Sequence, residues 1–255
     1  MKRVLPLILT SAALAAAQTP TLCLIGDATV RSGHGPAAVN QWGWGEKLTD
    51  FVDSGKANLV NLAGGQSNRN FYNSAAWEKT LAAIKPGDFL IIQFGHNDNL
   101  GDPAWATKAS LPGTGAETAD WNGATVHTYG WYLQQYIEAA RAKGDTPIVC
   151  SIVPRKEWKD GKINRDSSPF AKWAAEVALS ENAPFVDLQE IVACQYDRLG
   201  PVSVDPLFAD PHTHTSLAGA ELNAASLIAG LKGLPADPIE PYLSAKAAQI
   251  APWRP

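Results

Sequence analysis

Four short polar segments of this sequence together offer most of the parts of an acyl-transfer site. That reaction needs a nucleophile, a histidine base held by a carboxylate, and hydrogen-bond donors aimed at the developing oxyanion. His214, with Asp210 four residues before it, is the candidate base with its orienting acid. Asn97 is a candidate donor through its side-chain amide. Gly65 is another through its backbone N–H, because a residue without Cβ lets a substrate oxygen approach closely.

The candidate donors Asn97 and Gly65 also have purely structural interpretations. Asn97 and the following Asp98 could cap the next turn, and Gly65 could supply a turn with positive φ. Ser67 is interpreted as a helix cap rather than a nucleophile. The helix predicted from Ser216 favours a neutral imidazole just before it, which is the form that a base requires.

Strands must position these segments, and the chain has five apolar runs of strand length. The first begins at Thr21 and ends in Gly26-Asp27; the others are 58–63, 88–94, 147–153 and 184–188. Helical patterns are found at 46–52, 74–84, 129–143, 169–179, 189–199 and 216–231. Strands that alternate with helices favour a mostly parallel sheet with right-handed crossovers. Ligands of such sheets bind outside the carboxyl ends of the strands, where the polar segments can converge.

The loop after the first strand is the best place for a nucleophile, yet the residue that would carry it is Ala28. Thr29 is a poor substitute because its side chain would leave the turn in a different direction. A site that loses its nucleophile loses on the order of 10⁶ in turnover and keeps roughly 10³ to 10⁴ over water. The chain as written is therefore expected to be nearly inactive in acyl transfer.

The four segments resemble the blocks of a known family, the SGNH or GDSL hydrolases, and within it the rhamnogalacturonan acetylesterases. Gly26-Asp27-Ala28-Thr29 looks like the Gly-Asp-Ser-Thr block, and Gly65 like the glycine of the second block. Gly95-His96-Asn97-Asp98 and His212-Thr213-His214-Thr215-Ser216 look like the third and last blocks. Two further stretches, 42–46 and 218–221, extend the resemblance over most of the chain.

The resemblance implies an α/β fold, a three-layer α/β/α sandwich with a mostly parallel five-stranded sheet in the flavodoxin-like strand order 2-1-3-4-5. It places the nucleophile at position 28, where this chain has Ala28, and the base at His214. The implied oxyanion donors are the backbone N–H groups of Ala28 and Gly65 and the side chain of Asn97. The implied reaction removes acetyl groups from O-acetylated galacturonate in pectic polysaccharide, with no metal or organic cofactor.

The chain departs from the family pattern at two further positions. The family's carboxylate usually lies three residues before the histidine, where this chain has Pro211, so either Asp210 or Asp205 has to orient His214. Gln66 stands where pectin-active relatives often have arginine. With Ala28, these departures leave two explanations open: an engineered serine-to-alanine change, or a natural copy that lost catalysis and kept carbohydrate binding.

Nine tryptophans are many for 255 residues. Those in the loops beside the predicted crevice could stack on sugar rings, with ordinary packing as the alternative; they are Trp44, Trp105, Trp121 and Trp158. Trp77, Trp131 and Trp173 are assigned to helix faces in the core.

Metal binding is the rival chemistry, because histidine and aspartate side chains are Zn²⁺ ligands. The candidate ligands are His96, Asp98, Asp210, His212 and His214. The same residues fit the hydrolase blocks in order, so no metal site is predicted.

The net charge limits the kinds of partner that are expected, and the N-terminal segment predicts where the protein is located. The net charge of −4, without a basic run beyond the extreme N-terminus, gives no footprint for nucleic acid or an anionic membrane. Residues 1–17 have the three parts of a signal peptide, which predicts a secreted or periplasmic protein. Residues 18–255 are predicted to form one domain with a Pro- and Ala-rich tail from about 235. The expected protein is a monomer that binds an acetylated polysaccharide or oligosaccharide.

Cys23, Cys150 and Cys194 are interpreted as free thiols, with one disulfide as the alternative.

Overall fold

A five-stranded sheet forms the centre of the computed structural model, which describes residues 19–33, 40–98 and 107–255. The strands are β1 (Thr21–Gly26), β2 (Asn58–Asn61), β3 (Phe89–Gln93), β6 (Thr146–Cys150) and β9 (Phe185–Val186). They pair in parallel in the order β2-β1-β3-β6-β9. Counted along the chain this is the predicted order 2-1-3-4-5, so that expectation is confirmed.

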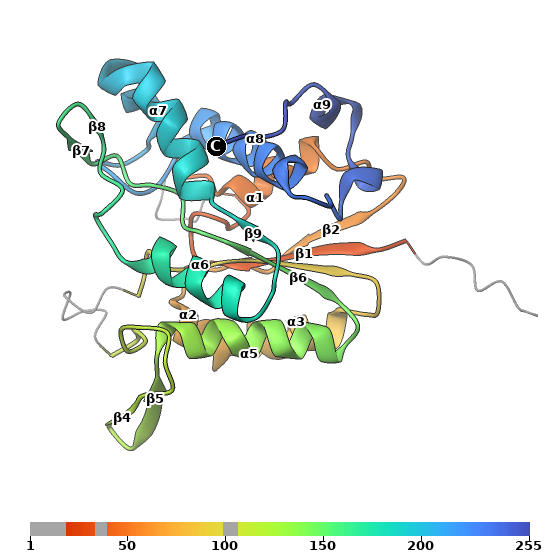
Figure 1. Ribbon diagram of the computed structural model, residues 1–255, viewed down its shortest axis with the longest axis vertical. Helices are drawn as coiled ribbons and strands as arrows, with labels where there is room; N and C mark the ends of the chain where they lie inside the picture. Colours follow the sequence, from red (N-terminus) through yellow and green to blue (C-terminus); the bar gives the residue numbers. More distant parts are fainter. Residues whose placement is uncertain (1–18, 34–39, 99–106) are drawn as a thin grey trace, which may run out of the picture.

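Helices cover both faces of the sheet, as Figure 1 shows, and so complete the three predicted layers. One layer holds α2 (Asn68–Tyr72), α3 (Ala75–Ala83), α5 (Tyr129–Ala142) and α6 (Phe170–Ser180). The other holds α1 (Trp44–Lys47), α7 (Leu188–Val204), α8 (Leu217–Gly233) and α9 (Ala245–Ala248). The 3₁₀ turns are η1 (Leu48–Asp50), η2 (Asp205–Leu207) and η3 (Glu240–Tyr242).

The strands supply the core between the layers because successive side chains point to opposite faces. In β1, Leu22 and Leu24 pack with the α1, α7 and α8 layer, whereas Cys23 and Ile25 pack with α3, α5 and α6. Parallel strands buried on both faces read as continuous apolar runs, as β3 does. In register, Gly26 lies opposite Gln93, so the loops that follow β1 and β3 begin at the same level.

Polar caps start the helices that border the site. Thr128 accepts a hydrogen bond from the backbone N–H of Trp131 at the start of α5, and Ser216 accepts one from Gly219 at the start of α8. Ser67 accepts one from Asn70 at the start of α2, so its predicted role as a cap is confirmed.

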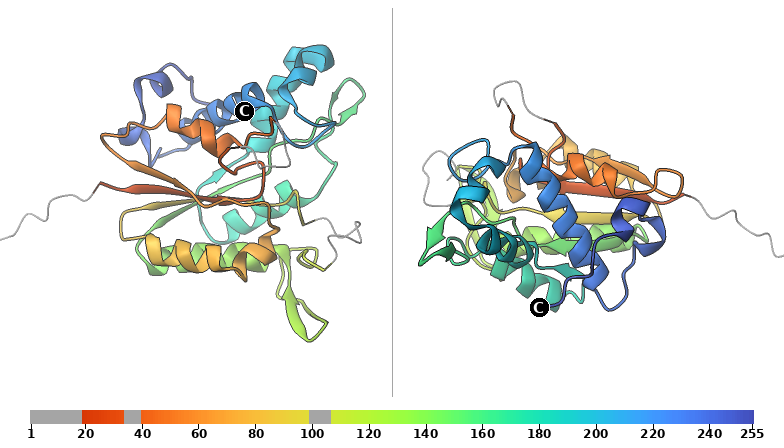
Figure 2. Two further views of the ribbon diagram at one scale, coloured as in Figure 1. Left: turned by 180° about the vertical axis from the view of Figure 1, so that it is seen from behind. Right: turned by 90° about the horizontal axis from the view of Figure 1, so that it is seen from above.

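Two hairpins lie in regions where the sequence pattern predicts loops. β4 (Thr118–Trp121) pairs with β5 (Ala124–His127), and the short β7 (Trp158–Lys159) pairs with β8 (Lys162–Ile163). Both project from the sandwich (Figure 2). Their strands are largely exposed, and exposed strands lack the apolar runs by which buried strands are recognised.

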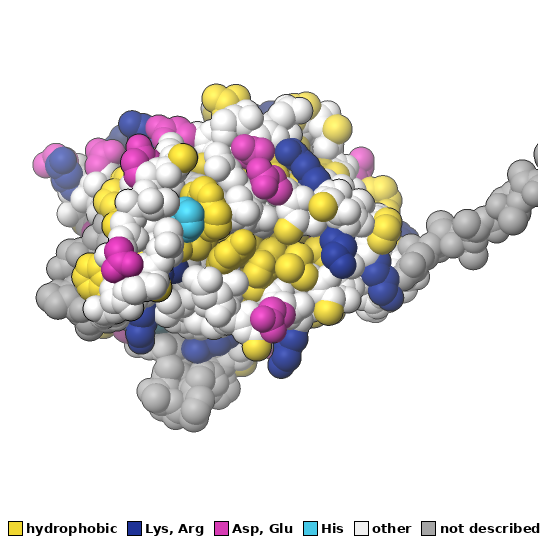
Figure 3. All heavy atoms as spheres, turned by 90° about the horizontal axis from the view of Figure 1, so that it is seen from below, with side chains coloured by type: hydrophobic (Ala, Val, Ile, Leu, Met, Phe, Trp, Pro, Cys, Tyr) yellow, Lys and Arg dark blue, Asp and Glu magenta, His cyan; other side chains and the backbone are white. Residues whose placement is uncertain are grey.

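The C-terminal tail packs on the α8 side of the sandwich. The backbone N–H of Trp253 donates to Ala229 in α8 (2.7 Å), and Lys232 Nζ donates to the carbonyl of Ala247 (3.1 Å). On the opposite face, seen in Figure 3, hydrophobic side chains gather in the middle, with charged side chains around them. No helix in the described ranges is long and apolar enough to cross a membrane.

The three cysteines are free thiols, and Cys23 and Cys150 are buried in the strands. Burial raises the pKa of the Cys23 thiol to about 12. The interpretation as free thiols is confirmed. The predicted signal peptide at 1–17 lies outside the described residues.

Candidate active site

The turn after β1 is held by the buried carboxylate of Asp27. Its Oδ1 accepts hydrogen bonds from the backbone N–H (3.0 Å) and the hydroxyl (2.8 Å) of Thr29. Its Oδ2 accepts one from the backbone N–H of His96 (3.1 Å) in the loop after β3. Asp27 therefore joins the two loops and leaves Ala28 partly exposed between them.

Trp44 supports this turn from inside the protein. Its indole is fully buried, and Nε1 donates to Gln93 Oε1 (2.8 Å), whose amide in turn donates to the Thr29 hydroxyl (2.7 Å). Its backbone N–H donates to the carbonyl of Thr29 (2.9 Å). The prediction that Trp44 stacks on a sugar is therefore wrong. The Gly-rich sequence around it suggested an exposed loop, but helix α1 buries the side chain.

Asp210 and His214 form a direct pair. The Nδ1 atom of His214 lies 2.5 Å from Asp210 Oδ2. The second carboxylate oxygen, Oδ1, accepts hydrogen bonds from the backbone N–H groups of His212 (3.0 Å), Thr213 (2.7 Å) and His214 (3.0 Å). The carboxylate thus closes a tight turn with one oxygen and holds the imidazole with the other. This geometry accommodates the four-residue spacing and Pro211.

The hydrogen bonds also set the charge of Asp210. Partial burial acts to raise its pKa, but it is outweighed by the hydrogen bonds from Thr213, from the His214 ring and from the other backbone N–H groups, which lower the pKa to about 2. The carboxylate is therefore ionised at neutral pH. The alternative acid, Asp205, is mostly exposed and pairs with Lys156 Nζ at 2.5 Å.

The histidine loop is tied to the loops of the sheet at several points. The backbone N–H of Trp42 donates to the carbonyl of Thr215 (2.9 Å), and the Thr215 hydroxyl donates back to the carbonyl of Trp42 (2.7 Å). Because Trp44 binds Thr29, the segment 42–44 links the Ala28 turn to the His214 loop. Burial lowers the pKa of the His96 imidazole; the carboxylate of Asp27 opposes this shift, and the charges of Arg155 and His214 add to it.

Two of the three proposed oxyanion donors, Gly65 and Asn97, lie side by side. Asn97 Nδ2 donates to the carbonyl of Gly65 (3.0 Å), with the carbonyl of Gln66 at 3.4 Å. Among the described residues, a Cβ at Gly65 would meet only the Arg31 guanidinium, whose Nη1 would lie 3.9 Å away. No other described residue fills the space in front of Gly65.

Arg31 is a cation beside this space that sequence reasoning missed. Its Nε is buried, and within the described part of the chain it has no hydrogen-bond partner. The position follows from the turn, because the backbone N–H of Arg31 donates to the carbonyl of Asp27 (3.3 Å). A lone arginine in a Gly-rich stretch carries no sequence signal for this contact.

The turn that Asp98 could cap begins at residue 99, outside the described residues. The buried carboxylate of Asp98 accepts hydrogen bonds from the backbone N–H of Asn68 (3.0 Å) and the hydroxyl of Ser110 (2.8 Å). Burial raises the pKa of Asp98 to about 6, against those hydrogen bonds. Asp98 therefore connects the loop after β3 to α2 and to the segment before β4.

The other tryptophans predicted to bind sugar occupy different settings. Trp121 is 42% exposed on the β4–β5 hairpin, and Trp158 is half-buried against the core. Trp105 lies outside the described residues. Trp77 is buried as predicted, whereas Trp173 is only partly buried.

The side chains of the rival metal site do not gather into one cluster. Within the described ranges, no group of three or more histidine, cysteine, aspartate or glutamate side chains could hold a metal ion. His214 bonds to Asp210, whereas the ring of His212 contacts the hydroxyl of Thr213.

A flavodoxin-like sandwich with a carboxylate–histidine pair and adjacent amide donors at its carboxyl edge is an arrangement that can serve acyl transfer in hydrolases. Residues 24–222 match the model of the GDSL-like lipase/acylhydrolase family. The chain belongs to this family, and the resemblance drawn from its four blocks is confirmed.

Individual relatives agree with this assignment. The chain is 27% identical to the rhamnogalacturonan acetylesterase of Emericella nidulans over 220 residues, which cover 84% of this chain and 86% of that protein. It is 30% identical to the probable rhamnogalacturonan acetylesterase YesY of Bacillus subtilis, over 83% of this chain and 93% of that protein. Among solved structures, the YxiM protein of Bacillus subtilis superposes with a TM-score of 0.69 at 23% identity; the match covers 84% of this chain and 56% of that one.

Proposed function

We propose that this chain is a secreted carbohydrate O-acetylesterase scaffold for pectic polysaccharide, nearly inactive as written because Ala28 occupies the nucleophile position. The observation that carries the proposal is the pair of His214 and Asp210, whose loop is tied through residues 42–44 to the Ala28 turn. The Gly65 and Asn97 donors lie together beside the loop after β3.

With serine at position 28, each group has a defined task. The serine oxygen attacks the acetyl carbonyl while the free ring nitrogen of His214 takes its proton, and Asp210 stabilises the resulting imidazolium. The backbone N–H groups of residues 28 and 65 and the amide of Asn97 bind the oxyanion. The sugar hydroxyl leaves with the proton from His214, and water then releases acetate by the same steps. Alanine removes the attacking oxygen and leaves the other groups in place.

The substrate class is supported by the relatives and by charge. Two relatives are named as certain or probable rhamnogalacturonan acetylesterases. The Arg31 guanidinium beside Gly65 supplies a cation next to the crevice, although position 66 is glutamine. A cation there favours a polymer that carries carboxylates near its acetyl groups.

Ala28 itself favours a second candidate function, which is carbohydrate binding without turnover. The chain as written would then hold an acetylated oligosaccharide and release no acetate. Calorimetry against pectic oligosaccharides tests this function, and the absence of binding would exclude it.

Restoring the nucleophile tests the esterase proposal. Ala28→Ser is expected to raise acetate release from acetylated pectin and from a small aryl acetate, by up to about 10⁶-fold in turnover. The double variant that also carries His214→Ala serves as the control and is expected to stay inactive. No gain in rate on either substrate would contradict the proposal.

A further inference from the structure

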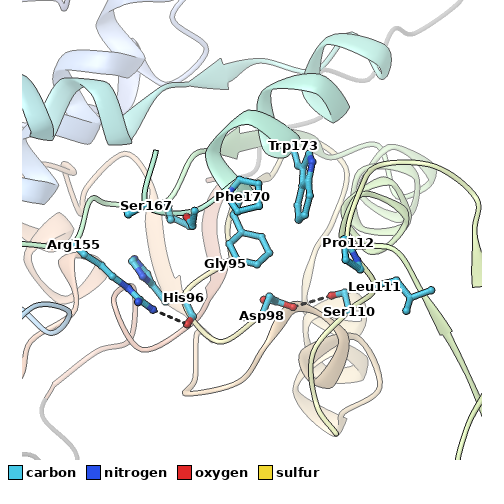
Figure 4. Close-up of a pocket in the computed structure, with 13 residues that line it drawn as sticks. Gly95, His96, Asp98, Ser110, Leu111, Pro112, Arg155, Ser167, Phe170 and Trp173 are labelled. Atoms are coloured by element: carbon cyan, nitrogen blue, oxygen red, sulfur yellow. Dashed lines mark hydrogen bonds between the residues drawn. The ribbon is translucent and has the colours of Figure 1, made fainter. Parts of the chain in front are cut away.

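A cavity of about 310 Å³ opens beside the proposed catalytic groups, on the side of the loop after β3 that faces α6 (Figure 4). Gly95, His96 and Asp98, which flank the proposed oxyanion donor Asn97, form part of its wall. The volume is at the lower end of the range of ligand pockets, about 300 to 1,000 Å³, and suits a ligand as small as a single sugar ring.

Two wall residues of this cavity carry polar atoms that lie behind its surface. The ring nitrogens of His96 and the hydroxyl of Ser168 have no hydrogen-bond partner within the described part of the chain. Because these atoms are inaccessible to solvent, a ligand in the cavity does not reach them, and its recognition has to come from other wall groups.

An apolar wall and a cation complete the cavity. Phe170 and Trp173 come from the first turn of α6, with ring centroids 5.3 Å apart, and Figure 4 shows them on one side of the cavity. Arg155 lies toward the other end; its Nη2 donates to the carbonyl of His96 (3.3 Å), and its Nη1 is 3.9 Å from Glu157. Its side chain is 29% exposed, so part of the guanidinium can reach a ligand.

We propose that this cavity is a subsite for one uronic-acid ring of the polysaccharide, next to the acetylated sugar at the catalytic groups. The ring packs against Trp173 and Phe170, and its carboxylate pairs with Arg155. The assignment rests on the proposed function, since it places the ring within the same polymer. It makes Arg155 and Trp173 specificity-determining residues.

Calorimetry on the Ala28 protein tests the subsite without turnover. The probes are a four-residue oligogalacturonide and neutral xylotetraose. Arg155→Gln is expected to weaken oligogalacturonide binding by about tenfold, which is the scale of a lost charged hydrogen bond. Trp173→Leu is expected to weaken it by at least about threefold through the lost aromatic face. Xylotetraose, which has no carboxylate, is expected to bind more weakly than the oligogalacturonide and to be insensitive to Arg155→Gln.

Arg141→Gln is the matched control. Arg141 also donates through Nη2 to backbone carbonyls, lies 3.9 Å from one glutamate, and is partly exposed, but it lies at the end of α5 away from the cavity. Equal binding losses in the two arginine variants, or unchanged binding in Trp173→Leu, would overturn the subsite. If Trp173→Leu fails to fold, Trp173→Met replaces it, with the same prediction of weaker binding. Acetate release by Ala28→Ser from the aryl acetate is a separate readout, so the esterase proposal and the subsite can fail independently.

Discussion

At the scale of single residues, the site depends on carboxylates that each make several contacts. Asp27 joins the Ala28 turn to the loop after β3, and Asp210 closes its own turn while it holds His214. Asp210 could be predicted from the sequence as a candidate orienting acid, but Asp205 stayed an alternative. The choice between them depends on how the chain turns at Pro211. Three backbone N–H groups on one carboxylate oxygen are a property of the folded turn and leave no signature in residue spacing.

Replacing the orienting acid tests this geometry. In the Ala28→Ser background, Asp210→Asn is expected to lower kcat on an aryl acetate by about 10³- to 10⁴-fold, since the amide favours the wrong imidazole tautomer. Asp205→Asn is the control and is expected to keep kcat within about twofold, because Asp205 pairs with Lys156 away from His214. A larger loss from Asp205→Asn than from Asp210→Asn would reverse the assignment.

At the scale of elements, the buried strands and long helices could be predicted, and the exposed hairpins could not. Apolar runs mark β1, β3 and β6 because both faces of these strands are covered. The β4–β5 hairpin is mostly exposed, so its sequence is polar and reads as a loop. The prediction for Trp44 was wrong in the other direction: an exposed side chain was expected, but it is buried. A short helix in a Gly-rich segment gives no periodic pattern that would indicate burial.

The contact between the loop after β3 and α6 offers a test at this scale. Gly95 has φ of +149°, and a Cβ there would approach Ile152 Cγ2 to 2.6 Å and Phe170 Cβ to 2.9 Å. Gly95→Ala is therefore expected to cost about 2–4 kcal/mol in the free energy of unfolding, from backbone strain plus overpacking. It is also expected to displace Asn97.

Gly87→Ala is the matched control, measured by the same denaturant unfolding. Gly87 has φ of +90° and open space around it, so only the backbone strain of about 1–2 kcal/mol applies. Equal losses in the two variants would mean that the packing of α6 against Gly95 does not matter for stability.

At the scale of the whole molecule, two helical layers and a packed C-terminal tail enclose titratable groups that play no part in the site. Asp145, between α5 and β6, is one of them. Its Oδ1 accepts a hydrogen bond from Thr146 (2.9 Å), whereas its buried Oδ2 has no partner among the described residues. Burial, with a smaller contribution from Asp88, raises the pKa of Asp145 to about 7.

This raised pKa predicts a pH dependence of stability. Between about pH 4 and 7 the folded protein holds a proton that the unfolded chain releases, so stability falls as the pH rises through that window. Asp145→Asn does not titrate and is expected to raise Tm at pH 8 by about 2–4 °C, with little change at pH 4. Thermal unfolding across this range is the measurement. Asp166→Asn, at an exposed position, is the control and is expected to show the same fall of Tm with rising pH as the parent protein. If Tm falls as much in Asp145→Asn as in the parent protein, the assignment is contradicted.

The central claim is that position 28 is the nucleophile position of an acyl-transfer site, and covalent labelling tests it most directly. The Ala28→Ser protein is treated with an aryl phosphonate ester. A serine activated by histidine attacks the phosphorus and displaces the aryloxide, and the phosphonyl adduct is located by peptide mass mapping. The account predicts one phosphonyl group at position 28, none in the Ala28 protein, and strongly slowed labelling when His214→Ala is added. No adduct at position 28, or an adduct at Ser67 instead, would contradict it.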